Sequence, residues 1–122
     1  CAFSYIFNPL PYMAPFELSG EPGRAAVIGT GILFVMWQVP YVFGLIHPLR
    51  NCRSLLEAVI MQAIGLIGES LLHSSIPVSH ISLRGSILRF IIFDAAGLVL
   101  LITAAACTFR TLKSDRGDSH VD

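Results

Sequence analysis

Three long apolar runs divide the chain, and charged residues or prolines separate them. The runs cover residues 25–46, 54–73 and 83–109. A helix needs about 20 apolar residues to cross the hydrocarbon core of a bilayer, and each run is about that long. The intervening segments, 47–53 and 74–82, have the length of ordinary helix–helix turns. The pattern therefore predicts an all-α integral membrane protein with three complete transmembrane helices.

The two ends of the chain break this regularity. Residues 1–7 are apolar and aromatic, and they could represent the first helix of a four-helix bundle whose remainder is missing. Four prolines between residues 9 and 22 predict an extra-membrane loop over 9–23, because proline removes a backbone donor. After residue 109 the chain is charged and has no apolar pattern, which predicts a mobile tail. We therefore divide the chain into an N-terminal segment, 1–24, a helical bundle, 25–109, and a cytoplasmic tail, 110–122.

Local signals refine the first two spanning helices. Pro40 lies inside the first run and predicts a kink there, because proline leaves one helical carbonyl without its donor. Ser54 and Glu57 have the spacing of a capping box, in which each side chain pairs with a free backbone N–H at a helix start. This spacing predicts that the second helix begins at Ser54.

Composition supports a membrane protein and excludes several other classes. Of the 122 residues, 54% are hydrophobic and only 13% are charged, whereas soluble domains carry about 25% charged residues. The net charge is zero, so nothing indicates a nucleic-acid partner. The cysteines have no zinc spacing, and we find no phosphate-binding loop or nucleophile motif. The sequence therefore names no catalytic residue, metal site or cofactor.

The distribution of lysine and arginine predicts the orientation. Arg50 and Arg53 occupy the first turn, and Arg110, Lys113 and Arg116 follow the last helix. Cytoplasmic loops are enriched in these residues. We therefore expect the C-terminus in the cytoplasm and residues 1–24 outside.

The cysteines have separate interpretations. Cys52 and Cys107 lie near the predicted cytoplasmic face and should be reduced thiols. Cys1 begins the chain, as the lipidated cysteine of a mature lipoprotein does. A missing upstream segment is the simpler interpretation, because terminal processing and truncation are common.

A polar cluster is predicted near the middle of the membrane. Gln38 and Gln62 each lie about 12 Å from the cytoplasmic ends of their helices, and Asp94 lies about 16 Å from the outer end of its helix. All three therefore approach the midplane of a core about 30 Å thick, where they could meet. Such groups usually join helices by hydrogen bonds. A ligand or proton site centred on Asp94 is the alternative.

Two further candidates lie closer to the outer surface. Glu69 and Arg89 are at similar depth and could form an ion pair, or each could extend to the interface. His73 follows Glu69 by one helical turn and could contact a ligand or pigment, although a histidine at a helix end is commonly an interfacial residue.

Several short features together resemble a known family. They are Asn8-Pro9, the basic turn from Arg50 to Arg53, the Gly65 and Gly68 helix, and the segment 93–97 around Asp94. The chain resembles the DoxX-like small four-helix membrane proteins of bacteria over nearly its whole length. That resemblance implies a four-helix bundle in a bacterial inner membrane, with residues 1–7 as the remnant of its first helix. The family has no uniform chemistry, so it implies no functional residue.

Two functions from different classes follow. The absence of a catalytic motif favours a structural or accessory subunit of a larger membrane complex, in contact with lipids and with other subunits or copies of itself. The alternative is an intramembrane small-ligand binder or isomerase, or a transporter component, that uses Asp94, Glu69 and His73.

Overall fold

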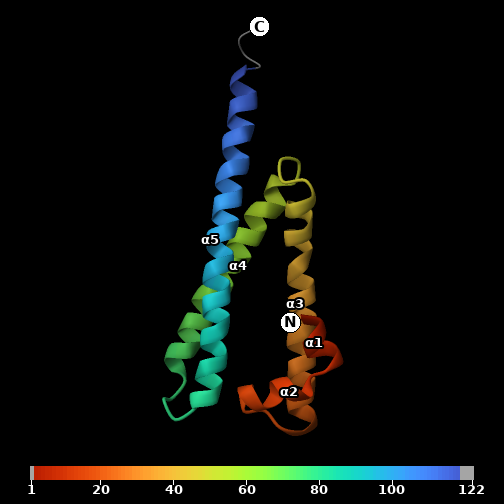
Figure 1. Cartoon of the computed structure of the whole chain (residues 1–122), viewed down its shortest axis with the longest axis vertical. Helices are drawn as coiled ribbons and strands as arrows, with labels where there is room; N and C mark the ends of the chain where they lie inside the picture. The colour runs from red at the N-terminus through yellow and green to blue at the C-terminus, as the bar shows by residue number, and fades with distance from the viewer. Residues whose placement is uncertain (1, 119–122) are drawn as a thin grey trace.

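The computed structural model describes residues 2–118, and these residues form helices joined by short turns, with no strand among them (Figure 1). In chain order the elements are α1 (Ala2–Phe7), α2 (Leu10–Met13), the 3₁₀ helix η1 (Ala14–Phe16), α3 (Gly20–Ile46), α4 (Cys52–Ser75) and α5 (Ile81–Asp118). Helices α3 and α4 and the Ile81–Lys113 part of α5 are long and apolar enough to cross a membrane. The predicted all-α membrane fold with three spanning helices is confirmed by the length and composition of these helices.

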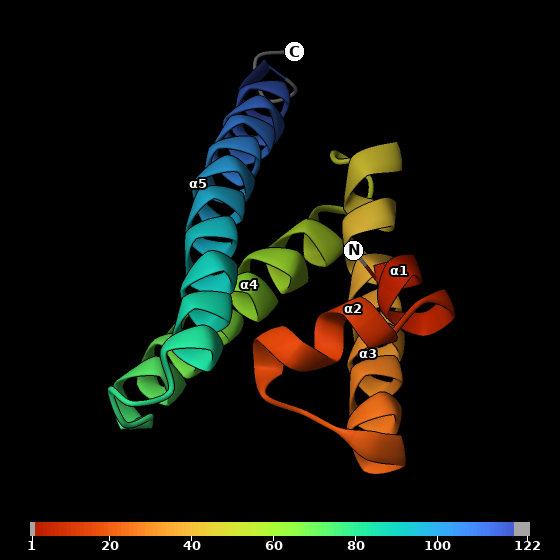
Figure 2. The same cartoon turned by 60° about the horizontal axis from the view of Figure 1, so that its bottom comes forward.

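The three long helices run up, down and up (Figure 1). The α3–α4 turn and the last residues of α5 lie toward one end of the molecule. At the opposite end lie η1, the start of α3 and the α4–α5 turn, and we call this the η1 end. Helix α4 packs against both α3 and α5, while α2 and η1 extend from α3 toward α5 (Figure 2).

The predicted loop over residues 9–23 is wrong. That segment contains α2 and η1, and α3 begins at Gly20. Pro11 and Pro15 lie within the first two residues of their short helices, and Pro22 lies in the first turn of α3. The first four N–H groups of a helix have no intrahelical acceptor, so proline costs little at these positions.

The predicted end of the last helix is also wrong. Helix α5 continues beyond residue 109 to Asp118, so the charged segment is helical over most of its length. The absence of an apolar face does not prevent helix formation, because arginine, leucine and lysine have high intrinsic helix propensity. Residues 119–122 of the predicted tail lie outside the described residues.

The predicted capping box at Ser54 is not present. Helix α4 begins at Cys52, and Asn51 occupies the cap position without a side-chain cap hydrogen bond. The Asn51 amide instead donates to the carbonyl oxygen of Phe43 at 2.9 Å. This hydrogen bond holds the turn to the end of α3. Helix α4 begins two residues earlier than the spacing predicts.

The N-terminal helices pack against α3 near the η1 end. Tyr5, Met13 and Val27 form a buried cluster, with Phe34 and Phe90 packed against it. Helix α1 approaches α3 at Gly31, where an added Cβ would lie 2.8 Å from the Tyr5 Cβ atom. Only glycine permits this approach without a shift of the two helices.

Candidate functional site

A buried amide joins the three long helices. Gln62 on α4 is only 8% exposed. Its Nε2 donates to the backbone carbonyl of Asp94 on α5 at 3.1 Å, and its Oε1 accepts a hydrogen bond from the Tyr41 hydroxyl on α3. We call Tyr41, Gln62 and Asp94 the Gln62 network. Both ends of the amide are paired, which is how a membrane interior tolerates a polar side chain.

Two glycines make room for this network. A Cβ added at Gly97 on α5 would lie 2.9 Å from Gln62 Nε2. A Cβ added at Gly65 on α4 would lie 2.8 Å from Asp94 Oδ2. Each helix therefore places a glycine against a polar side chain of the other, so α4 and α5 can approach closely with both polar groups between them.

The predicted cluster of Gln38, Gln62 and Asp94 is only partly assembled. Gln62 and Asp94 meet, but through the Asp94 backbone carbonyl. Gln38 is exposed and takes no part. Its place is taken by Tyr41, three residues farther along α3. Sequence reasoning matched the residues by depth, and the missing information was the rotation of α3, which turns Tyr41 toward α4.

A cavity of about 290 Å³ is lined by residues of α1, η1, α3, α4 and α5. Its lining is almost entirely apolar. Five aromatic residues and one acid contribute to it: Tyr5, Phe16, Phe34, Trp37, Phe90 and Glu69. Sequence reasoning did not foresee this aromatic group, because its members come from four separate elements.

Glu69 lines this cavity without a partner among the described residues. Its Oε2 atom is buried and accepts no hydrogen bond there. The predicted ion pair with Arg89 does not form, since Arg89 is exposed and the charged contacts of residues 2–113 are Arg24–Glu21 and, when the histidine is protonated, His80–Glu17. The residues of α5 that line the cavity are Ile87 and Phe90, and Arg89 is not among them.

The Arg84 side chain donates hydrogen bonds to backbone carbonyls at the end of α4. Its Nη1 donates to the carbonyl oxygens of His73 at 2.9 Å and Ile76 at 2.6 Å. These are carbonyls at the C-terminal end of α4, which lack intrahelical donors and carry partial negative charge. The His73 backbone is thus used structurally, and its half-buried imidazole does not line the cavity. No group of three potential metal ligands occurs among the described side chains.

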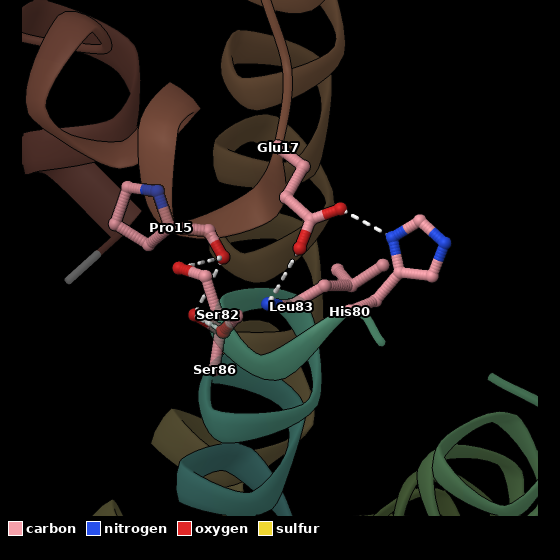
Figure 3. A network of polar contacts seen from close by, with 6 residues as sticks. All are labelled: Pro15, Glu17, His80, Ser82, Leu83 and Ser86. Carbon is pink, nitrogen blue, oxygen red and sulfur yellow. Dashed lines mark hydrogen bonds and ion pairs between the residues drawn. The ribbon is translucent and has the colours of Figure 1, made fainter. Parts of the chain in front are cut away.

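A second polar network lies at the η1 end, where it joins η1 and the residue after it to the start of α5 (Figure 3). Ser86 and Ser82 donate to the Pro15 carbonyl at 2.9 and 3.5 Å. One carboxylate oxygen of Glu17 lies 2.5 Å from His80 Nδ1, and the other accepts from the Leu83 backbone N–H at 3.4 Å. We call these six residues, Pro15, Glu17, His80, Ser82, Leu83 and Ser86, the η1 network.

Glu17 acts as the N-terminal cap of α5, although it is distant in sequence. Leu83 lies in the first turn of α5, where backbone N–H groups are free and a negative charge is favourable. Glu17 is held in the left-handed region, with φ of 57°. The hydrogen bond with His80, aided by the Leu83 N–H, holds the pKa of the Glu17 carboxyl below its ordinary value.

The cysteines add no further site among the described residues. Cys52 is partly buried and Cys107 is exposed, and both are free thiols. Cys1, the predicted lipidation candidate, lies outside the described residues.

Comparison with known proteins finds no matching family model, no matching curated protein and no matching solved structure. The resemblance to DoxX-like proteins therefore stays a prediction.

Proposed function

We propose that this protein is an accessory subunit of a larger membrane complex and that it binds a neighbouring helix through one face of α3. The observation that carries the proposal is the exposure of Gln38, in the central part of α3. Polar side chains within spanning helices normally face protein, because hydrocarbon offers no hydrogen-bond partner. A neighbouring chain would supply that partner.

The proposed binding face extends along α3 from Gln38 toward Ile46. Gln38, Val42 and Leu45 are spaced as i, i+4 and i+7, so they share one side of the helix. Val42 and Leu45 are 49% and 83% exposed. Helix α1 packs against α3 around Gly31 and leaves these later turns free. The face thus combines apolar area for packing with one amide that sets the register of a partner helix.

We further propose a bacterial inner membrane location with the α3–α4 turn and the C-terminus in the cytoplasm. Arg50, Arg53, Arg110 and Lys113 are exposed toward that end of the molecule, in agreement with the preference of cytoplasmic segments for basic residues. Protease added to spheroplasts, whose outer membrane has been opened, should leave a C-terminal tag uncut. Removal of the tag by the protease would show that the protein has the opposite orientation.

The accessory role is tested by purification from native membranes in a mild detergent. The wild-type protein should elute with a stoichiometric partner chain, and Gln38→Leu should release the partner while the bundle stays folded. Thr103→Val is the matched control, because the Thr103 hydroxyl is exposed but already donates to the Val99 carbonyl of its own helix at 2.8 Å. A monomer, or an assembly of this chain alone, would contradict the proposal.

The alternative function required one site shared by Asp94, Glu69 and His73. Of these residues only Glu69 lines the cavity. The geometry therefore supports neither an acid–base pair with His73 nor a proton path through all three residues.

A further inference from the structure

The cavity beside Glu69 is walled by stacked and tilted aromatic rings. The Phe34 ring lies 5.7 Å from Phe90, 5.8 Å from Tyr5 and 6.3 Å from Trp37, between ring centroids. Phe16 adds a fifth ring, 5.9 Å from Phe90. The face of an aromatic ring carries negative electrostatic potential and attracts cations that lie over it.

The same cavity contains an acid that lacks a cation. Glu69 Oε2 is buried without a hydrogen bond among the described residues. A second carboxyl, that of Asp94 on α5, lies against Gly65 of α4. Gly65 is one helical turn from Glu69. The nearby arginines do not compensate, because Arg84 binds the carbonyls that end α4 and Arg89 is exposed. Glu69 is half-buried, and its buried Oε2 atom has no partner to offset the cost of desolvation, so a cation from outside the chain is favoured here.

We propose that this cavity binds a small hydrophobic ammonium ion, with its cationic group against Glu69 and its apolar body among the aromatic rings. The volume limits the size of the ligand. A cavity of about 150 Å³ holds benzene. The 290 Å³ here therefore suits one aromatic ring with a short quaternary or substituted ammonium group.

The charge of the ligand distinguishes this site from a simple apolar void. A neutral hydrocarbon would fill the volume but leave the Glu69 oxygen without a partner, which retains its desolvation penalty. An ammonium ion forms an ion pair that carries no net charge and also contacts ring faces. Charge complementarity therefore selects a cation over a neutral molecule of the same shape.

Trp37 supplies a direct measurement, since it is the only tryptophan of the chain and lines the cavity. The purified full-length protein in detergent is titrated with benzyltrimethylammonium while tryptophan fluorescence is recorded. Neopentylbenzene, in which carbon replaces the charged nitrogen, is the neutral ligand of matched shape. Each ligand is titrated into wild type and Glu69→Gln, and the ratio of the two affinities cancels uptake by the micelle.

The expected ratio is about tenfold or more for the ammonium ion and close to one for neopentylbenzene. Glu57→Gln is the matched control, because Glu57 is an exposed acid on the same helix, and it should bind the cation as wild type does. A ratio close to one for both ligands, or a fluorescence change that does not saturate, would overturn the proposal. Binding restricted to the neutral ligand would also overturn it.

A second measurement decides the matter if Glu69→Gln does not fold. Wild-type protein is treated with dicyclohexylcarbodiimide, which modifies carboxyl groups in apolar surroundings, and the modified residues are mapped by mass spectrometry. Benzyltrimethylammonium should protect Glu69 and neopentylbenzene should not. Equal modification of Glu69 with and without the cation would refute the site.

Discussion

The two polar networks of this protein join helices by different means. The η1 network uses a carboxylate, a histidine, two hydroxyls and free backbone groups, and its Glu17 and His80 side chains are exposed. The Gln62 network uses an amide, a phenol and a backbone carbonyl, with glycines that admit them. Water can replace a lost partner in the first network. No water replaces a lost partner in hydrocarbon. The Gln62 network should therefore contribute more to the free energy of unfolding than the η1 network does.

The largest effect is expected from Gln62→Leu. The change leaves the Tyr41 hydroxyl without its acceptor and removes the hydrogen bond to Asp94, so the free energy of unfolding should fall by about 1–3 kcal/mol. Unfolding in mixed micelles with increasing dodecyl sulfate measures it. Gln38→Leu is the same substitution at an exposed position and should leave the isolated protein unchanged. Equal losses from both variants would remove the distinction between the two sites.

A smaller effect is expected from Gly97→Ala. The added Cβ would lie 2.9 Å from Gln62 Nε2, and the resulting overpacking should outweigh the better helix propensity of alanine, for a net loss of about 1 kcal/mol. Gly29→Ala is the control, because no atom lies within 4 Å of its added Cβ. That variant should be neutral or more stable. Thermal unfolding that ranks the two variants in the opposite order would place α4 and α5 farther apart than described.

The smallest effect is expected at Glu17, and it should be local and dependent on pH. Because the pKa of Glu17 is lowered in the folded protein, its stabilising contribution is present above the ordinary carboxyl pKa. It is lost as the pH falls through the lowered value. Exchange protection of the Leu83 amide, corrected for the intrinsic rate, should therefore decrease on acidification.

Glu17→Gln serves as the control for that pH dependence. In the variant, Leu83 protection should be lower at neutral pH and should show no loss over the carboxyl range. An identical pH profile in wild type and variant would show that another group caps α5.

The sequence predicts the number and class of the long helices because spanning length is a property of composition. It does not predict which residues meet across them, because that depends on helix rotation. Gln38 and Tyr41 lie only about 60° apart around α3 and about one turn apart in depth, so a match of depth alone cannot select between them. The Glu17 cap of α5 was also missed, since capping patterns in sequence are local and this cap comes from residues far upstream.

Two other features of the structure, the helices around the N-terminal prolines and the aromatic cavity, were also not predicted. The prolines of residues 9–23 led to the prediction of a loop. Pro11, Pro15 and Pro22 all lie at helix starts, where a backbone N–H has no intrahelical acceptor and its absence costs little. The cavity of Glu69 was not foreseen, because its aromatic rings come from α1, η1, α3 and α5 and converge only in the fold.

If the Gln62 network lies inside a membrane while the η1 network lies at its surface, the two should differ sharply in their accessibility to water-soluble reagents. Single cysteines at positions 17, 80, 62 and 94 are compared in lipid nanodiscs, which expose both membrane faces, after the native cysteines are replaced. A charged maleimide should label positions 17 and 80 readily and leave 62 and 94 unlabelled until the protein is unfolded. Labelling of 94 as fast as 80 in the folded protein would contradict the account.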